Sequence, residues 1–399
     1  MTSTRSRWTV VRMKNLSLGC FLIMTALTLG AAMALASSHR PDPIASESKA
    51  CGVRRPIDLV ICLDTSGSME GLLDSARARL WDIVNSLSQA KPTPILRVGL
   101  LTYGSPSNAS AAAGWVAWQT GLTSDLDTVY AKMMSLRTDG GNEFVGWVLN
   151  DAFGRMDWSK DPNALKLIFV AGNESADQAS EVYNFRIVAG QARVRDITIN
   201  SIFAGNRQQG INEHWDQVAS CGGGTYSAID MQCGTVQIET PHDKLLLELN
   251  MKLNATYIPY GSLGEAGRHN QETQDRAADA VGAASGASRV AAKASALYDN
   301  SHWDLVDAVA DGKAQLKDIK KDELPAAMQS LPLAEQEKLV EHSRMERAGI
   351  QEQITQNQVA RDRYLREARA RAAGGKTALD DAMLETLRTQ AKAKGFKFE

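Results

Sequence analysis

Two continuous apolar runs constrain the fold of this chain more than any other feature. The runs are LVICL at residues 59–63 and LKLIFVA at residues 165–171. Neither run alternates apolar and polar residues in the way of a strand with one solvated face, so both are expected to be central strands buried on both faces. Such strands are typical of parallel sheets covered by helices, and the residues that follow them lie at one edge of the sheet.

Strand and helix patterns alternate around these two runs. Apolar residues recur at helical spacing over residues 72–89. Further helices are expected at 125–136, 145–156, 181–195, 211–220 and 242–253. Further strands are expected at 97–103, at 114–119 along an edge, at 197–204 and at 225–229. The alternation predicts an α/β fold with a doubly wound, mostly parallel six-stranded sheet over residues 57–260, closed by the helix at 242–253.

The turn after the first run carries three oxygen-bearing side chains. Asp64, Ser66 and Ser68 follow the strand in the sequence DTSGS, and Gly67 permits a tight turn that aims both serines at one point. A carboxylate with two hydroxyls suits a hard divalent cation such as Mg2+, which prefers oxygen ligands. The alternative interpretation is a helix N-cap by Ser66 or Ser68, with Asp64 as an acid at the strand end.

The pattern D-x-S-x-S, with a buried strand before it and a helix behind it, resembles the metal-ion-dependent adhesion site (MIDAS) of the von Willebrand factor A (VWA) family. The resemblance covers about residues 56–260 and implies a Rossmann-like VWA fold. It also implies a non-enzymatic protein-binding module, used for adhesion or as a scaffold. In such a module Mg2+, Mn2+ or Ca2+ at Asp64, Ser66 and Ser68 keeps one coordination position for a carboxylate of a protein partner.

The resemblance implies two further ligand positions. The second metal loop of the family usually presents a threonine after a pair of glycines, and this chain has GGNE, in which Glu143 is best placed to reach a cation. The alternative for Glu143 is a first-turn glutamate favoured by the helix dipole. The third loop usually gives an aspartate after the central strand, where this chain has Gly172. Asn173 is the expected substitute, with Glu174 or water as alternatives.

Two other classes of function remain open. Asp64 could be the nucleophile of a phosphotransferase of the haloacid dehalogenase type, although Ser66 stands where that motif, D-x-D-x-[TS], has its second acid. Alternatively, the domain is a scaffold with a degenerate metal site, and the helical tail binds the partner. The sequence contains no H-E-x-x-H, G-x-S-x-G or Walker motif, so we expect a protein that is not an enzyme.

The N-terminal residues resemble an export signal. Four basic residues precede an apolar segment over residues 16–36 that ends in ALA, which predicts a signal peptide of residues 1–36 or an uncleaved membrane anchor. We therefore expect a periplasmic or extracellular protein, which contacts the membrane only if this segment is retained. Residues 37–56 are expected to form a linker. The net charge of -2 does not favour nucleic acid as a partner.

Cysteine use in an exported chain permits disulfides. Outside the leader the chain has Cys51, Cys62, Cys221 and Cys233. Cys62 lies within the first apolar run and is expected to be a buried thiol, whereas Cys51 and Cys221 are both expected before strands of the sheet. We therefore favour a bridge between Cys51 and Cys221, with the other connectivities open.

The C-terminal half is expected to be helical. Residues 261–297 are polar and rich in alanine, which predicts a linker that is partly helical, and residues 298–399 form a helical region. Within it, residues 333–373 can form one long helix, but Asn357 and Arg361 break its heptad pattern, so a solvated helix or hairpin is favoured over a coiled coil. A last helix is expected at 377–392. The whole layout is similar to exported bacterial proteins with one VWA-type domain and a helical tail.

Overall fold

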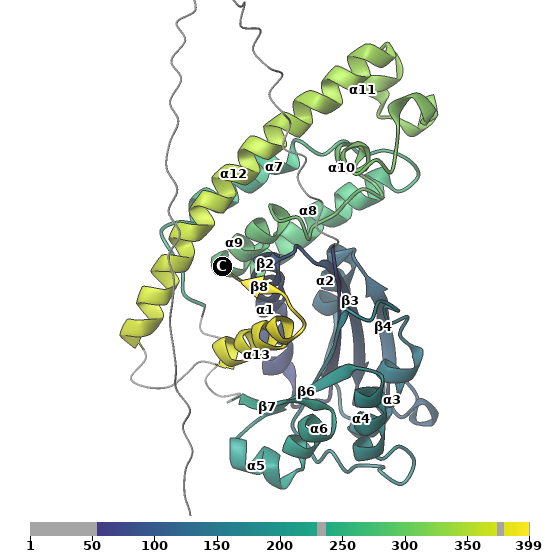
Figure 1. The fold of residues 1–399 in the computed structure, drawn as a ribbon, viewed down its shortest axis with the longest axis vertical. Coiled ribbons are helices and arrows are strands. Elements are labelled where there is room, and N and C mark those ends of the chain that lie inside the picture. The colour runs from purple at the N-terminus through teal and green to yellow at the C-terminus, as the bar shows by residue number, and fades with distance from the viewer. Residues whose placement is uncertain (1–53, 230–236, 373–378, 399) are drawn as a thin grey trace, which may run out of the picture. The chain divides into compact units, whose positions relative to one another are not determined.

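The computed structural model describes residues 54–229, 237–372 and 379–398 (Figure 1). These residues all belong to one compact unit. The expected signal segment at 1–36, most of the linker at 37–56, and Cys51 and Cys233 lie outside the described residues. Among the described helices, none is both long enough and apolar enough to cross a membrane.

The central sheet has six strands. They are β4 (Ala117–Thr123), β3 (Ile95–Tyr103), β1 (Pro56–Asp64), β5 (Leu165–Gly172), β6 (Ile197–Ala204) and β7 (Gly223–Ile229), in that spatial order. All neighbours are parallel except β3 and β4. The predicted doubly wound, mostly parallel sheet is therefore confirmed, and the edge strand lies slightly later in the chain than expected.

Strand β1 is buried on both faces because its side chains alternate between two apolar cores. Leu59 and Ile61 pack with residues of α1 (Glu70–Ser88) and α2 (Leu126–Ser135). Val60 and Cys62 pack with residues of three other helices. These are α3 (Val145–Arg155), α4 (Phe185–Val194) and α6 (Trp215–Cys221). The helix expected at 211–220 is instead divided between α5 (Arg207–Asn212) and α6, because His214 takes a left-handed backbone conformation between them.

Helix α7 (Asp243–Asn254) does not close the sheet as expected. Its apolar residues Leu246, Leu249 and Leu253 lie in a separate cluster with residues of α9 (Ala283–Lys293) and α12 (Leu333–Ala372). The sheet face beside α1 is covered instead by α13 (Leu379–Ala393), whose residues Leu387 and Ala391 belong to the core under α1. The C-terminal helix, and not the helix expected at 242–253, therefore completes the sheet domain.

Two further contacts hold the C-terminal residues on the sheet domain. The side-chain amides of Asn200 in β6 and Gln390 in α13 donate to each other, at 3.0 and 2.7 Å. In addition, β8 (Lys397–Phe398) pairs antiparallel with β2 (Ala90–Lys91). The last helix was predicted from the sequence, but its place on the sheet was not.

Residues 261–297, which we expected to form a partly helical linker, contain two packed helices. Helices α8 (Gly264–Val281) and α9 contact each other, and α9 also packs on α1 and α7. Every residue of α9 from Ala284 to Lys293 is buried. The run of Ala, Ser and Gly at its start suggested mobility, but small side chains instead allow close packing between neighbouring helices.

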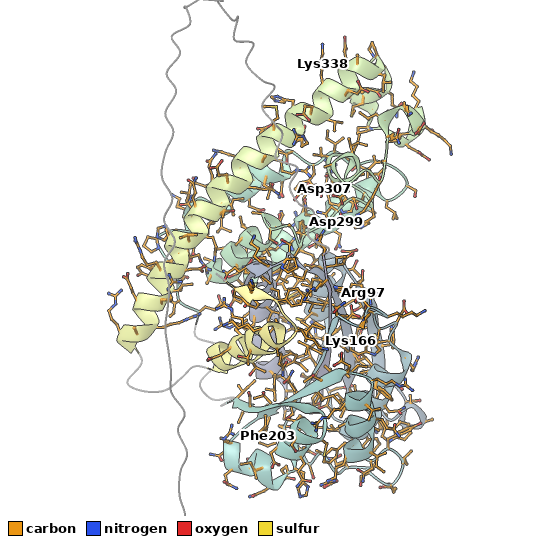
Figure 2. The ribbon with its side chains drawn as sticks, viewed as in Figure 1. Arg97, Lys166, Phe203, Asp299, Asp307 and Lys338 are labelled. Atoms are coloured by element: carbon orange, nitrogen blue, oxygen red, sulfur yellow. The ribbon has the colours of Figure 1, made fainter. Side chains whose placement is uncertain are left out.

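Helix α12 is a single helix that packs through one side. Val340, Arg347, Ile354 and Arg361 recur every seven residues and are all buried. The guanidinium of Arg361 pairs with Asp243 of α7 at 2.7 Å, so this residue continues the contact side instead of interrupting it. Other residues of α12, such as Lys338 near its start, are exposed (Figure 2). Of the two expected forms, a solvated helix or a hairpin, the structure has a single helix.

The N-terminal half of α12 is held by a second buried arginine. The Arg347 guanidinium pairs with Asp304 at 2.7 Å and with Asp307 at 2.5 Å, and it donates to the Thr256 carbonyl at 2.7 Å. Asp304 is the N-cap of α10 (Leu305–Ala310) (Figure 1), and Asp307 lies within it, as Figure 2 shows. The intervening chain forms η2 (Leu316–Asp318), η3 (Lys321–Glu323) and α11 (Ala326–Gln329).

A buried ion cluster fastens α9 to the sheet domain. Arg289 of α9 pairs with Asp127 of α2 at 2.7 Å and with Asp275 of α8 at 2.6 Å. Lys293 pairs with Asp275 at 2.9 Å. Although burial opposes ionisation, the charges of Lys293 and Arg289 hold the pKa of Asp275 below its ordinary value. The cluster therefore joins three helices through charges that compensate one another.

We predict that Arg289→Met destabilises the protein by about 3–5 kcal/mol, because it leaves Asp127 and Asp275 buried with fewer compensating charges. Denaturant unfolding followed by circular dichroism measures this change. Arg268→Met is the matched control, since Arg268 is exposed on α8 and pairs only with its neighbour Glu265 in the described residues. Its cost should stay within about 0.5 kcal/mol. Equal costs for the two variants would contradict the assignment.

Candidate metal site

Four loops meet at the carboxyl ends of β1, β3 and β5. The loop after β1 is joined to the others by backbone hydrogen bonds from Thr65 N to the Tyr103 carbonyl at 2.8 Å and from Asp139 N to the Thr65 carbonyl at 3.1 Å. The loop before α3 touches the loop after β3 so closely that a Cβ on Gly141 would lie 2.1 Å from the Gly104 carbonyl oxygen. Glycine at 141 is therefore required by the close approach of the two backbones.

Asp64, Ser66 and Ser68 lie together in the first of these loops. The Asp64 side chain is completely buried, and its Oδ1 accepts a hydrogen bond from Ser66 N at 2.7 Å. The two serine hydroxyls are 3.5 Å apart. The N-cap of α1 is Met69, and it has no side-chain capping bond. The alternative in which Ser66 or Ser68 caps this helix therefore does not describe the structure.

Glu143 brings a second carboxyl group to Asp64. Its side chain is 2% exposed, and it lies two residues before the start of α3. A Cβ on Gly104, whose φ is +83°, would be 2.6 Å from Asp64 Oδ1 and 3.3 Å from Glu143 Cγ, so both side chains rest against this glycine. The Glu143 backbone N–H donates to Gln178 Oε1 at 3.1 Å. Gln178 thus positions Glu143 from the loop after β5.

Asn173 completes the group from the end of β5. Its Nδ2 donates to Ser68 Oγ at 2.9 Å. The alternative residue at this point, Glu174, accepts a hydrogen bond from Gln178 Nε2 at 2.5 Å and is exposed. Of the two, Asn173 is therefore the one that contacts the serine loop.

Tyr103 explains why the third loop carries glycine in place of an aspartate. The Tyr103 hydroxyl donates to the Ala171 carbonyl at 2.9 Å and is completely buried. A Cβ on Gly172 would lie 2.4 Å from this hydroxyl and 3.1 Å from the Trp215 ring. The space for an aspartate at this position is thus already filled by a side chain from β3.

Three oxygens of the group have no hydrogen-bond partner within the described part of the chain. They are Asp64 Oδ2, Glu143 Oε2 and Asn173 Oδ1, and all three are buried. Burial, followed by the adjacent Glu143 carboxyl, raises the pKa of Asp64 well above its ordinary value. Neighbouring buried carboxyl groups need either a proton or a cation between them. Carboxylate, hydroxyl and amide oxygens form a donor set that suits Mg2+, Mn2+ or Ca2+.

The site contains two carboxylates, and the other candidate donors are hydroxyl and amide groups. Consistent with this, the described residues contain no cluster of three or more His, Cys, Asp or Glu side chains that could hold a metal. A metal here would therefore depend on hard, largely neutral oxygen ligands, as expected for Mg2+ with retained waters.

Three residues that shape the site were not identified from the sequence. Tyr103 fills the third position, and Gln178 positions Glu143. Asp139 accepts hydrogen bonds from the hydroxyls of Ser105 and Ser107, which lowers its pKa and ties the second loop to the loop after β3. Asp139 precedes Gly140 in the TDGG sequence of the second loop, so its position beside the site could have been predicted from the sequence. The roles of Tyr103 and Gln178 depend on contacts across the sheet.

Comparison with known proteins finds likenesses that cover only part of the chain. No protein-family model and no curated protein sequence matches the chain. Among solved structures, proximal thread matrix protein 1 from the mussel byssus, with a zinc-occupied MIDAS motif, is 13% identical, with a TM-score of 0.35. The match covers 46% of this chain and 43% of that one.

Two further structures are similar at the same level. The SpRpn10 VWA domain is 16% identical, with a TM-score of 0.34, and the match covers 44% of this chain and 88% of that one. The pilus adhesin SpaC from Lactobacillus rhamnosus GG, in an open conformation, is 15% identical with a TM-score of 0.35, over 45% of this chain and 29% of that one. The chain thus matches less than half the length of the byssus protein and of SpaC. The strand order described above defines the fold of the sheet domain as a doubly wound, mostly parallel α/β sheet.

We predict that Gly172→Ala destabilises the protein by roughly 1–3 kcal/mol, because the new methyl group overlaps the Tyr103 hydroxyl. In a Tyr103→Phe background the same substitution should cost less, and a double-mutant cycle from denaturant unfolding measures the difference. Gly154→Ala is the control, since a Cβ there meets no atom within 4 Å. It should be neutral or stabilising by up to about 1 kcal/mol. The same cost for Gly172→Ala in both backgrounds would refute the steric explanation.

We also predict that Asp64→Asn stabilises the protein in the presence of EDTA at neutral and higher pH. A carboxyl group whose pKa is raised by folding binds its proton more tightly in the folded state than in the unfolded state, so stability falls as the pH rises through the raised pKa. The melting temperature of the variant should exceed that of the parent by a few degrees at about pH 8 and converge with it near pH 4. A loss of stability in the variant that does not vary with pH would contradict this prediction.

Proposed function

We propose that the sheet domain is a non-enzymatic protein-binding module whose site holds a divalent cation through Asp64, Ser66, Ser68, Glu143 and Asn173. The observation that carries the proposal is the set of buried oxygens without hydrogen-bond partners on Asp64, Glu143 and Asn173. These three atoms come from three separate loops, and a cation would compensate all of them at once. When bound, the cation supplies an electrophilic position that a carboxylate of a protein partner can occupy.

Hydrogen bonds within the chain hold the proposed ligands in position. Ser66 N fixes Asp64 by a hydrogen bond, Gln178 fixes the backbone of Glu143, and Ser68 is held by Asn173. The hydroxyls of Ser105 and Ser107 both donate to Asp139; Ser107 is exposed and forms part of the surrounding surface, whereas Ser105 is buried beneath it. These loops are the natural source of specificity for one partner over another, because they surround the proposed cation position.

The comparisons are consistent with this class of function without extending to its details. One structural neighbour is named for a zinc-occupied MIDAS motif, and another is a pilus adhesin. We propose Mg2+ or Mn2+ as the ion because the donors are hard oxygens and include no thiolate or imidazole among the five proposed ligands. Export to the periplasm or the cell exterior, based on the N-terminal segment, is part of the same proposal.

The phosphotransferase alternative has less support. Its general acid would stand at position 66, where this chain has Ser66, which has no carboxyl group to protonate the leaving group. In the scaffold alternative the helical tail binds the partner, so no cation is required at the site. If it holds, partner binding is independent of Ser66 and Ser68.

We predict that Mg2+ or Mn2+ raises the melting temperature of the full chain by several degrees. A ligand at about a hundred times its dissociation constant contributes about 2.7 kcal/mol to the stability of the folded state. Asp64→Asn and the double variant Ser66→Ala, Ser68→Ala should abolish the shift. Asp157→Asn, an exposed acid that follows α3, should retain it. The full chain is used because α8, α9 and α13 cover the sheet domain, and a 57–260 fragment lacks them.

The absence of a cation-dependent shift in the parent, or its persistence in Asp64→Asn, would refute the metal site. Turnover of an aryl phosphate that is lost in Asp64→Asn would instead favour the phosphotransferase.

The proposed role of a partner carboxylate is testable with Mn2+ as a paramagnetic probe. In the Mn2+-loaded protein, an aspartate-containing peptide should displace coordinated water and lower the water proton relaxation rate, because a carboxylate is the better ligand for the open position. The matched peptide with asparagine should have little effect. If both peptides act equally, or neither acts, partner recognition does not proceed through a carboxylate at the ion.

A further inference from the structure

A polar cleft of about 900 Å³ separates the C-terminal part of α12 from α13, α9 and the end of α1. It exists because α12 packs on α7, α9 and α10, while its later residues extend beyond these helices (Figure 1). The volume lies in the range of small-molecule binding sites. None of the proposed metal ligands lines this cleft.

The α12 side of the cleft is lined mostly by polar side chains, with Ile354, Val359 and Leu365 between them. Thr355, Gln358, Asp362, Arg366 and Arg369 recur at helical spacing and line it. The apolar residues that attach α12 to the body, such as Ile354, lie at its floor. Gln358 Oε1 is buried and has no hydrogen-bond partner in the described part of the chain. A polar lining of this kind is not suited to closure by apolar packing, and it offers hydrogen bonds to a ligand.

The charges of the lining are unequal. Six basic side chains line the cleft, namely Lys91, Arg361, Arg366, Arg369, Arg388 and Lys392. Three acidic side chains accompany them, namely Asp82, Asp362 and Glu385. One residue of each sign is already paired: Asp82 with Arg79 at 2.9 Å and Arg361 with Asp243 at 2.7 Å. The cleft therefore carries an excess of positive charge.

Arg388 is the basic residue best placed to meet an anion. Its Nε donates to Ser86 Oγ at 2.9 Å and its Nη2 to Gln89 Oε1 at 3.1 Å, and both acceptors are neutral. Within the described residues it forms no ion pair. Lys392 lies four residues further along α13, and Lys91 of β2 also lines the cleft. Like charges four residues apart on a helix repel each other, so an anion between them would be favourable.

We propose that this cleft binds a small anionic molecule with at least two acidic groups, of the phosphorylated or polycarboxylate class, through Arg388, Lys392 and Lys91. The guanidinium of Arg388 supplies directional hydrogen bonds to one acidic group. The two ammonium groups supply charge to another. Gln358 and Thr355 on α12 provide neutral hydrogen-bonding groups for the remainder of the ligand. This site is separate from the proposed metal site.

Calorimetric titration with inorganic pyrophosphate and with citrate tests the proposal. The full chain is first freed of divalent cations on a chelating resin, and both probes are then added at about 0.15 M salt with no soluble chelator present, because EDTA is itself a polycarboxylate. At least one probe should bind with a dissociation constant below about 1 mM, and the tighter of the two indicates the class of ligand. Binding of neither probe below about 1 mM would overturn the proposal.

Variants locate the binding. Arg388→Gln and Lys392→Gln should each weaken binding by roughly tenfold, the equivalent of one charge-assisted hydrogen bond. Lys392 is exposed, so the second variant is informative even if the first proves unstable. Arg363→Gln is the matched control, because Arg363 is exposed on α12 and does not line the cleft. Equal weakening by Arg363→Gln would show non-specific attraction and overturn the assignment. Asp64→Asn should leave anion binding unchanged, so this result stands apart from that for the metal site.

Discussion

The burial of two carboxyl groups side by side is the constraint on which the site depends. Asp64 and Glu143 rest against Gly104, and both side chains are almost fully shielded from solvent. Such a pair is unfavourable when both groups are ionised and nothing positive accompanies them. The parallel pairing of β1 with β3 brings Asp64 and Gly104 to one edge of the sheet, and the loop before α3, which carries Glu143, packs against Gly104 there. The fold thereby creates a requirement that a cation can satisfy, and the neighbouring hydroxyl and amide groups determine which kind of cation is suited.

Most of the sheet domain was predictable because its sequence signals are local. A continuous apolar run such as residues 59–63 can be buried on both faces only in a covered parallel sheet, and helices between strands then follow from the period of their apolar residues. Asp64, Ser66 and Ser68 were predictable as a group for the same reason, since they belong to one turn. The structure brings them together with Glu143 and Asn173, as the resemblance implied, while their role as metal ligands remains a proposal.

The parts that sequence reasoning missed depend on contacts between distant residues. Arg361 looked like an interruption of a heptad pattern because a charged residue is normally exposed, but its pairing with Asp243 makes burial favourable. Residues 283–293 looked like a linker because small residues are common in mobile segments, yet here they allow α9 to be buried between α1, α7 and α8. Tyr103 could not be assigned to the third metal position, because its hydroxyl reaches Gly172 only once β3, β1 and β5 are assembled. In each case the deciding partner lies far away in the sequence.

The position of α13 on the sheet has a consequence for how the chain acquires its structure. All six strands of the main sheet precede residue 230, whereas the helix that covers β7 and packs beside α1 begins at Leu379. During synthesis the strands emerge first, and one apolar surface of the sheet stays accessible to water, to chaperones and to other chains until the last helix arrives. Joining elements so far apart also incurs a larger loop-closure entropy than a cover taken from the adjacent sequence, which slows folding. The late arrival of this helix therefore leaves part of the core under α1 uncovered until the end of synthesis.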